Sequence, residues 1–375
     1  MEGVRKNTNP ADYGFLIDPY TDWLRDEGVP VVEGYGIDLF AVETKPWARF
    51  NADGAVVHLK GRGEFNTMFL LDLLPGTSTP PLRHMYEEII FVLEGRGSTQ
   101  VELADGSVHS FEWGPKSLFS VPLNAKHRIF NASGRERARL ALCNYIPLVK
   151  NLYRNDDFIF NCPFSFPERE GESKYFEGEG DHISAAGTWH HWVTNFIPDV
   201  SGFSDLQPLE SRGAASTNIS IQMADGVMKA HLSAMPVGTY KKAHRHGPDF
   251  FIFNITGSGY SLMWPQGEKD FIRVDWRYGM LFAPPDMMFH QHFNTSKEPA
   301  RYLAVALGGM KYPFLALRRK QLMGSDVNVG DGGGQIEYAD QDPRIHSLYL
   351  RELEKNGVES RMGKYIDESA VKVGA

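Results

Sequence analysis

An internal repeat constrains this sequence more than any other feature, because two copies of one pattern require two copies of one fold. A shift of 162 positions superposes Gly76 on Gly238, His84 on His246 and Gly95 on Gly257. After one inserted residue the shift becomes 163 and superposes five further identical residues: Trp113 on Trp276, Phe119 on Phe282, Pro122 on Pro285, His127 on His290 and Asn131 on Asn294. Identities of so many residue types at constant shifts indicate a duplicated domain.

Each copy predicts a β-rich barrel. Short alternating segments such as Ser98–Leu103 and Phe271–Trp276 are bounded by turn residues, and the chain of 375 residues contains 37 Gly and 22 Pro. We therefore expect an all-β protein with two tandem barrels and a few helices. The expected parts are an N-terminal extension 1–45, a first barrel 46–150, a connection 151–212, a second barrel 213–318 and a C-terminal tail 319–375.

The tail contains the clearest helix signal. Asp342 and Pro343 form a good helix start, and Gly357 forms a stop, so we expect a helix that packs against a barrel or a second subunit. Duplicated barrels of this kind also suggest a homo-oligomer. In the connection, the charged run from residue 164 to 182 indicates a surface segment, and the group 190–192 is expected to be packed rather than a lid.

Composition favours a small-molecule partner. The net charge of −8 and the absence of a dense Lys/Arg run argue against nucleic acid and anionic membranes as partners. No stretch of about 18 apolar residues predicts a membrane span, and the first residues lack the apolar core of a signal peptide. Cys143 and Cys162 have no metal-finger spacing. We expect a cytoplasmic protein.

The second copy contains the best candidate for a metal site. In the run AHRH, His244 and His246 point to one side of a strand, and His290 lies in the matching later strand. Three neutral imidazoles suit iron, copper, zinc or nickel and leave positions open for substrate and oxygen. His292 has the same parity as His290, so we expect it to move a proton or orient the substrate.

The first copy differs at this site. It keeps His84 and His127 but has Leu82 where the second copy has His244, and Glu88 is predicted to share their face. Two histidines and one carboxylate can hold iron or manganese, although a buried hydrogen-bond network of polar remnants is the alternative. Conversely, Phe250 replaces the glutamate in the second copy, which leaves more positive charge and favours an anionic or enolate-like substrate.

These blocks resemble the two cupin motifs, G(x)5HxH(x)3–4E(x)6G and a later segment that ends in H(x)3N. The second copy is most similar to gentisate and salicylate ring-cleaving dioxygenases, which share an AHRH pair, lack the motif glutamate and have a WHxH-like segment. Here these features are residues 243–246, Phe250 and residues 289–292. The resemblance implies Fe(II), O2 and a hydroxylated aromatic acid. In that group the metal-bearing barrel is usually N-terminal, whereas the fuller set here is C-terminal.

The sequence thus favours a non-haem Fe(II) dioxygenase that acts on a small hydroxylated aromatic or enolisable acid, with Mn, Ni, Zn or Cu as other metals. The alternatives are a metal-dependent isomerase, decarboxylase or lyase, and a non-catalytic bicupin that binds metal or a small molecule. A carboxylate substrate needs a cation. Four basic residues lie near in sequence, and we expect each to be an exposed charge instead: Lys241, Lys242, Arg273 and Arg277.

Overall fold

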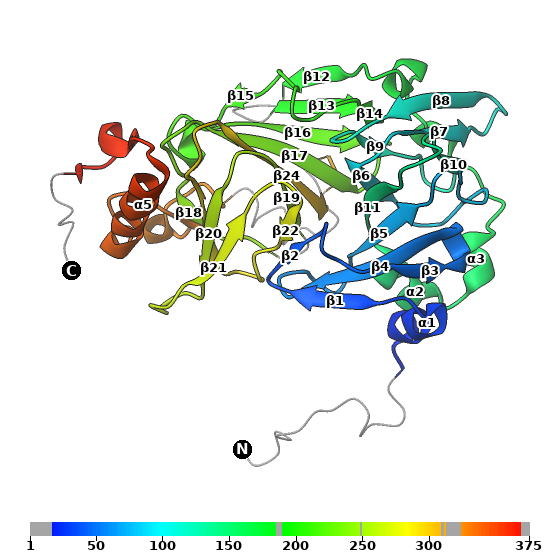
Figure 1. Ribbon diagram of the computed structural model, residues 1–375, viewed down its shortest axis with the longest axis horizontal. Coiled ribbons are helices and arrows are strands. Elements are labelled where there is room, and N and C mark those ends of the chain that lie inside the picture. Colours follow the sequence, from blue (N-terminus) through cyan, green and yellow to red (C-terminus); the bar gives the residue numbers. More distant parts are fainter. Residues whose placement is uncertain (1–16, 185–189, 248–249, 309–310, 313–323, 369–375) are drawn as a thin grey trace, which may run out of the picture.

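The computed structural model describes residues 17–184, 190–247, 250–308, 311–312 and 324–368. Two barrels stand side by side, and each consists of a larger and a smaller β-sheet (Figure 1). The all-β fold with two tandem barrels is therefore confirmed. The start of the predicted N-terminal extension and the predicted boundary at residue 319 lie outside the described residues.

The first barrel contains the repeat's first copy. Its larger sheet has the order β1-β4-β5-β11-β6-β9-β14, with β3 paired to β4, and its smaller sheet has the order β10-β7-β8. The strands are β1 (Val31–Gly34), β3 (Lys45–Trp47), β4 (Ala52–Leu59), β5 (Thr67–Leu73), β6 (Glu88–Glu94), β7 (Gly97–Glu102), β8 (Val108–Trp113), β9 (Leu118–Ser120), β10 (Lys126–Asn131), β11 (Ala138–Asn144) and β14 (Phe196–Ile197).

The second barrel repeats this plan. Its larger sheet has the order β12-β13-β16-β17-β24-β19-β22-β2, with β15 paired to β16, and its smaller sheet has the order β21-β20-β23-β18-β25. The strands are β2 (Gly36–Asp38), β12 (Asp181–Ser184), β13 (His190–Thr194), β15 (Gln207–Pro208), β16 (Thr217–Met223), β17 (Met228–Met235), β18 (Ala243–His244), β19 (Phe250–Thr256), β20 (Gly259–Trp264), β21 (Ile272–Trp276), β22 (Met280–Phe282), β23 (Phe289–Asn294), β24 (Ala300–Leu307) and β25 (Gln335–Ile336).

Two strands cross between the barrels. β2 lies early in the chain but pairs with β22 of the second barrel, and β14, which follows the first barrel in sequence, returns to pair with β9. The segment between the copies is therefore more than a surface connection, because β13 joins the second barrel's larger sheet through β16. An apolar core spans both larger sheets, with Phe91 and Phe253 in contact at a ring-centroid distance of 5.1 Å.

The repeated residues hold the same turns in both copies. Gly76 and Gly238 have φ angles of 68° and 71°, which favour glycine. The amide of Asn131 donates to three backbone carbonyls, those of residues 73, 74 and 136. Asn294 makes the equivalent bonds to residues 235, 236 and 298. Identical residues at constant shifts thus reflect identical turn geometry.

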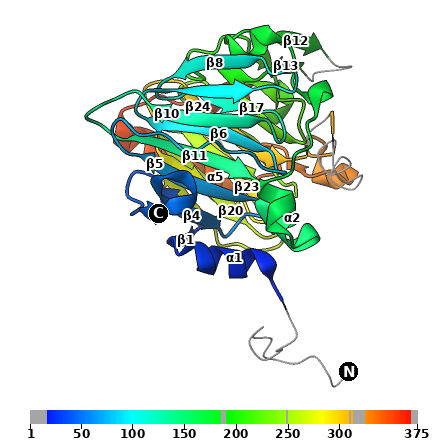
Figure 2. The same ribbon diagram turned by 90° about the vertical axis from the view of Figure 1, so that its right-hand side faces the viewer.

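Four α-helices are described: α1 (Pro19–Glu27), α2 (Ile146–Tyr153), α3 (Asp156–Phe160) and α5 (Pro343–Asn356). The predicted tail helix is α5. The Asp342 side chain accepts a hydrogen bond from the backbone N–H of Arg344, and Gly357 ends the helix in the left-handed conformation. Tyr349 of α5 donates its hydroxyl to the carbonyl of Asn294, so the helix packs on the second barrel. Figure 2 shows α1 and α2 at one edge of the first barrel.

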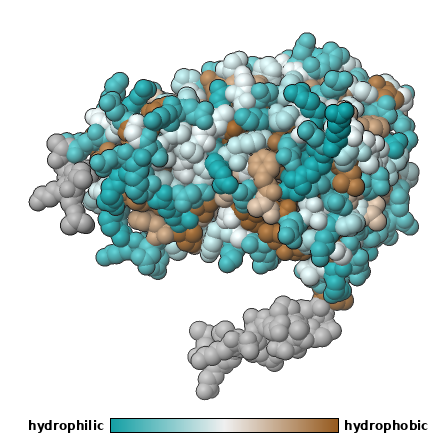
Figure 3. Space-filling model, viewed as in Figure 1, coloured by the Kyte–Doolittle hydropathy of each residue, from teal (hydrophilic) through white to brown (hydrophobic). Residues whose placement is uncertain are grey.

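The surface seen in Figure 3 is mostly hydrophilic, and its apolar side chains form small separate patches. Within the described residues, no helix has the length and apolar character needed to cross a membrane.

Candidate metal centres

Three histidines converge inside the second barrel. His244 faces His290 directly across the pairing of β18 with β23, and their ring centroids are 4.3 Å apart. His246 follows β18 and lies 4.7 Å from His290 by the same measure. One ligand nitrogen from each residue lies within 4.8 Å of the others, and all three side chains are buried. The structure therefore brings together the set that strand parity predicted.

Backbone carbonyls fix the tautomer of these three rings. The Nδ1 atoms lie 3.3 Å from Lys242 O, 2.8 Å from Gly247 O and 3.1 Å from Met288 O, for His244, His246 and His290 respectively. Because a carbonyl only accepts, each Nδ1 carries the proton, and the lone pair of each Nε2 is available for a metal ion. Burial lowers the pKa of His244 well below its ordinary value and that of His290 to about 4. These two ligands are neutral at pH 7.

His292 lies beside the triad with different partners. Its ring centroid is 5.6 Å from that of His290, and its Nδ1 is 2.8 Å from the Ser261 hydroxyl. That hydroxyl accepts a hydrogen bond of 2.9 Å from the indole N–H of Trp276. Burial lowers the pKa of His292 well below its ordinary value. A neutral imidazole on a fixed hydroxyl can present one defined nitrogen to the cavity.

The first barrel brings His84, Glu88 and His127 together. Glu88 Oε1 lies 3.3 Å from His84 Nε2 and 3.7 Å from His127 Nε2. The Nδ1 atoms of the two histidines lie 2.7 Å from Tyr86 O and 3.0 Å from Ala125 O, so their tautomers match those of the second barrel. Glu88 Oε1 and His127 Nε2 are buried and have no hydrogen-bond partner among the residues described. This unsatisfied pair fits a cation better than a closed polar network.

Electrostatics support the same conclusion for this group. Burial alone would raise the pKa of Glu88, but the interaction with His84, with a contribution from His127, lowers it below the ordinary value. Burial lowers the pKa of His127 to about 4. An ionised carboxylate beside a neutral imidazole is the form in which both act as ligands.

A small cavity of about 70 Å³ lies next to the triad of the second barrel. Its floor is a face of the larger sheet, and polar side chains from adjacent strands point into it. Three of the lining residues are cationic, namely Arg212, Lys229 and Lys241, and none of the described lining residues is Asp or Glu. Phe250 occupies the position of the missing glutamate, 4.3 Å from His246 between ring centroids.

The prediction that Lys241 is an exposed charge is wrong. Its side chain is 3% exposed, lines the cavity and donates to the Tyr302 hydroxyl at 2.9 Å. Strand alternation would have placed Lys241 opposite His244, but no regular pairing exists at Lys242, which lies between the Lys241 bridge and β18. The chain therefore changes its side-chain alternation at this point.

The other three basic residues lie outside the cavity, and two of them, Arg273 and Arg277, are exposed as expected, whereas the Lys242 side chain is only 16% exposed. Lys242 pairs with Glu337, Arg273 with Asp275 and Glu352, and Arg277 with Asp38. Arg277 is the most exposed of these cations, at 65%.

Among the lining residues that sequence reasoning missed, four carry cationic, imidazole or phenol groups, namely Arg212, Lys229, His231 and Tyr302. Lys229 and His231 alternate with apolar residues on β17, and His231 pairs in register with Ser220 of β16. The alternation of Lys229, His231 and Ser233 was a usable signal. It was missed because polar residues on alternate positions of a strand usually face water.

The first barrel has a larger and more open depression of about 450 Å³. His84 and Tyr86 lie on its wall with stacked rings 3.8 Å apart. Arg49 also lines it, but this guanidinium is paired with Glu27 and lies 4.1 Å from the ring of Phe160. The depression therefore reaches the candidate ligand His84 from outside.

Comparisons with known proteins agree with this fold. Residues 69–144 match the family model described as Cupin domain. Auxin-binding proteins T85 and T92 of Nicotiana tabacum are 31% and 33% identical to this chain over 110 residues, which are 28% of it. The chain spans 57% of the length of these curated relatives.

Similar solved structures include Bacillus subtilis oxalate decarboxylase, described in one case by its Mn(II) centres. That chain is 13% identical, with a TM-score of 0.45 over 74% of this chain and 78% of its own. The same enzyme at pH 4.6 gives 14% identity and a TM-score of 0.45, with 74% and 76% covered. A likeness of this degree carries no information on activity. The fold is that of two tandem cupin-type barrels, and the first barrel also matches the Cupin domain model in sequence.

Proposed function

We propose that the second barrel is the site of a divalent-metal-dependent enzyme that acts on a small organic acid. The observation that carries this proposal is the convergence of three buried imidazoles, two of them with strongly lowered pKa values, beside a cavity lined by cations. An anion that enters the cavity meets positive charge from the protein as well as from the metal ion.

His244, His246 and His290 would hold the ion through their Nε2 atoms. A bound divalent cation would supply Lewis acidity toward a carboxylate and, if redox-active, electrons for O2. Three imidazoles with no carboxylate suit Fe(II), Zn, Ni or Cu, and Mn is a further candidate. The chain's own contribution is to hold the three rings in one tautomer within a buried site.

His292 is the proposed catalytic residue. In this role the Ser261 hydroxyl, which accepts from Trp276, donates its own proton to His292 Nδ1. His292 Nε2 then carries its proton toward the cavity and can donate to an oxyanion on the substrate. Tyr302, whose ring centroid is 5.0 Å from that of His292, adds a hydroxyl donor to the same wall.

Among reaction classes we favour non-oxidative chemistry, meaning decarboxylation, another lyase reaction or isomerisation. Such reactions form a carbanion or enolate, which hydrogen-bond donors and cations such as His292 and Lys241 can stabilise without a co-substrate. Dioxygenation of a hydroxylated aromatic or enolisable acid is the second candidate. Its support is the AHRH pair with Phe250 in place of the carboxylate ligand, the pattern that resembles ring-cleaving dioxygenases.

Turnover with and without oxygen separates these functions. Protein loaded in turn with Fe(II) or Mn(II) would be mixed with small hydroxy, keto and dicarboxylic acids under argon and under air. Full-rate conversion under argon supports the non-oxidative class, whereas conversion that requires O2 and consumes it supports the dioxygenase. Metal-loaded protein that binds acids but converts none of them under either gas would contradict an enzymatic role and leave a binding module.

For the first barrel we propose a second metal site that has no polar cavity inside the barrel, although the open depression reaches His84 from outside. The supporting observation is that fully buried apolar side chains occupy the positions equivalent to the second barrel's cavity lining, among them Phe69, Leu71 and Leu140. Metal bound there by His84, Glu88 and His127 would chiefly stabilise the barrel.

A further inference from the structure

A buried ammonium group lies in the second barrel apart from the three metal ligands. Lys241 is 3% exposed, and its Nζ donates to the Tyr302 hydroxyl at 2.9 Å and lies 4.9 Å from the centre of that ring. No Asp or Glu in the described parts of the chain forms an ion pair with it. A buried lysine normally requires a counter-charge, because removing an ammonium ion from water is costly.

The pKa of the neighbouring His231 reflects the positive charge of this region. It lies part-buried on β17, and its ring centroid lies 6.0 Å from that of Tyr302. Burial first, and then the charges of Lys229, Lys241 and Arg212, lower its pKa well below the ordinary value. Three cations thus act on one neutral imidazole, and the cavity wall combines positive potential with hydrogen-bond donors.

His292 lies between the triad and the group formed by Lys241, Tyr302 and His231. The ring centroid of Tyr302 is 5.0 Å from that of His292, which in turn is 5.6 Å from that of His290. Both groups line the same cavity of about 70 Å³. If one water needs about 10–15 Å³ of such volume, the space admits roughly five to seven non-hydrogen atoms. A ligand of that size can reach both groups.

We propose that Lys241, Tyr302 and His231 form an anion subsite, and that the ligand of the second barrel is a short dianionic acid such as a dicarboxylate. One acid group lies at the histidine triad, and the other accepts hydrogen bonds from Lys241 and Tyr302. The metal end of this arrangement rests on the function proposed above. A monocarboxylate at the triad would leave the Lys241 ammonium buried without a counter-charge, whereas a dianion compensates both ends.

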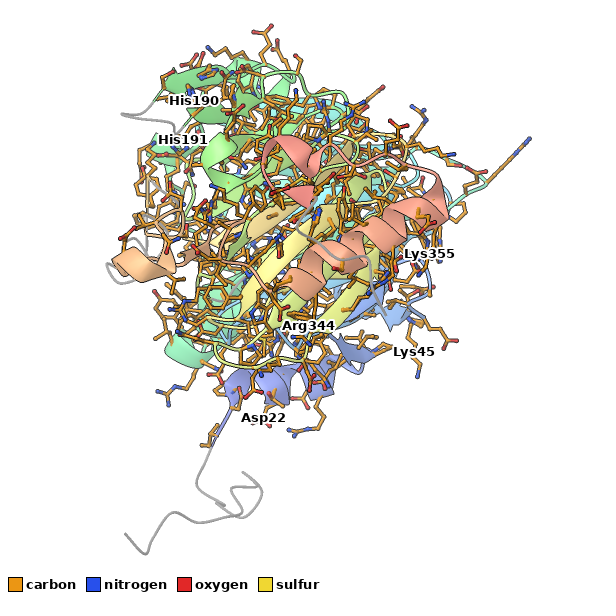
Figure 4. All side chains as sticks on the ribbon, turned by 90° about the vertical axis from the view of Figure 1, so that its left-hand side faces the viewer. Asp22, Lys45, His190, His191, Arg344 and Lys355 are labelled. Carbon is orange, nitrogen blue, oxygen red and sulfur yellow. The ribbon has the colours of Figure 1, made fainter. Side chains whose placement is uncertain are left out.

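Calorimetric titration with malonate and acetate tests this subsite. With Mn(II)-loaded full-length protein, malonate is expected to bind at least about tenfold more tightly than acetate, and Lys241→Met is expected to remove that advantage. The matched control is Lys355→Met on α5, a residue at the surface in Figure 4 whose side chain is 68% exposed. This variant is expected to bind malonate as the wild type does. Equal affinities for the two acids, or an unchanged malonate affinity in Lys241→Met, would overturn the proposal.

Titration of chelator-treated protein separates the subsite from the metal-dependent function. Malonate binding there is expected to be weaker but still dependent on Lys241. If the triad binds no metal, the proposed function fails, yet Lys241-dependent binding to the metal-free protein still supports the subsite. If metal binds at the triad while Lys241→Met has no effect, the subsite fails and the proposed function stands.

A second variant guards against a folding defect. Tyr302→Phe removes the hydroxyl but keeps the ring, so folding is expected to survive while the malonate affinity falls by about three- to tenfold. Circular dichroism and metal content check the fold. Should Lys241→Met not fold, an unchanged malonate affinity in folded Tyr302→Phe would overturn the subsite on its own.

Discussion

The two barrels share one backbone plan but differ in what fills them. Phe69 and Leu71 of the first barrel are equivalent to His231 and Ser233 of the second. Leu140, which pairs with Leu71, is equivalent by strand register to Tyr302, which pairs with Ser233. The first barrel is packed with apolar side chains there, and the second keeps a polar cavity. The shared glycines and asparagines maintain the turns in both, so the fold survives the exchange of interior residues.

The ligand sets differ in a complementary way. The first barrel has Leu82 in place of His244 and keeps Glu88, whereas the second keeps three histidines and has Phe250 in place of the glutamate. The carboxylate ligand Glu88 therefore lies in the first barrel, whose interior is filled by apolar side chains. The cations Lys229 and Lys241 line the polar cavity inside the second barrel. This division suggests that the first centre is structural and the second catalytic.

The largest expected effect tests this division of roles. His246→Ala should lower turnover by about three orders of magnitude, because a lost metal ligand removes several kcal/mol of transition-state stabilisation. His84→Ala changes the equivalent residue of the first barrel and should lower turnover by less than about tenfold. Steady-state kinetics at equal protein and metal concentrations measure both. Equal losses of turnover in His246→Ala and His84→Ala would contradict the division into a structural and a catalytic centre.

The next effect concerns acid stability and should be similar in the two barrels. His127 and His290 occupy equivalent positions, and burial lowers both pKa values to about 4 from an ordinary value of 6.5. The unfolded chain therefore binds more protons as the pH falls from 6.5 toward 4. Over that range each histidine should lower the free energy of unfolding by on the order of 3 kcal/mol.

Urea unfolding of chelator-treated protein at pH 7 and pH 5 checks this prediction. His127→Gln and His290→Gln should each reduce the difference between the two pH values. A metal-free protein whose stability does not change between pH 7 and pH 5 would show that these histidines titrate normally.

Substitutions at Phe250 and Glu88, the equivalent positions where only the first barrel has a glutamate, should have smaller effects. Phe250→Glu adds a carboxylate to the second centre, so the metal affinity should rise by about tenfold or more, while acid binding falls because positive charge is neutralised. Competition with a coloured chelator measures the affinity. Glu88→Gln in the first barrel is the opposite change and should weaken metal binding there. If Phe250→Glu left both affinities unchanged, Phe250 would not occupy the ligand position that the alignment of the repeats assigns to it.

The smallest expected effect concerns the hydroxyl beside His292. Ser261→Ala removes the hydrogen bond to Nδ1, so the ring loses its fixed orientation and turnover should fall by about tenfold, with metal content unchanged. Thr99→Val is the matched change in the first barrel, where Thr99 also accepts from a tryptophan, Trp113. That variant should keep full turnover. A comparable loss in both variants would indicate a packing defect rather than an effect on His292.

The sequence predicted the fold and the triad well because both depend on local pattern. Repeated turn residues indicated two barrels, and strand parity brought His244 and His246 to one side. The anion-binding wall was not predictable in the same way. Lys241 enters the cavity because the alternation breaks at Lys242, and Tyr302 reaches it from a strand about sixty residues further along the chain.

The crossing strands were also beyond sequence reasoning. β2 has three residues and β14 has two, so neither shows a measurable period. Their pairing with β22 and β9 depends on how the two barrels pack together. Contacts of this kind are set by tertiary structure rather than by local pattern.

The central claim is that the histidine triad of the second barrel binds a metal ion. Anomalous diffraction from crystals of the metal-loaded protein, recorded above and below the absorption edge of the metal, tests it most directly. The account predicts a peak about 2.0–2.2 Å from the Nε2 atoms of His244, His246 and His290. Metal-loaded crystals with no peak at these nitrogens, or with a peak only at His84, Glu88 and His127, would contradict it.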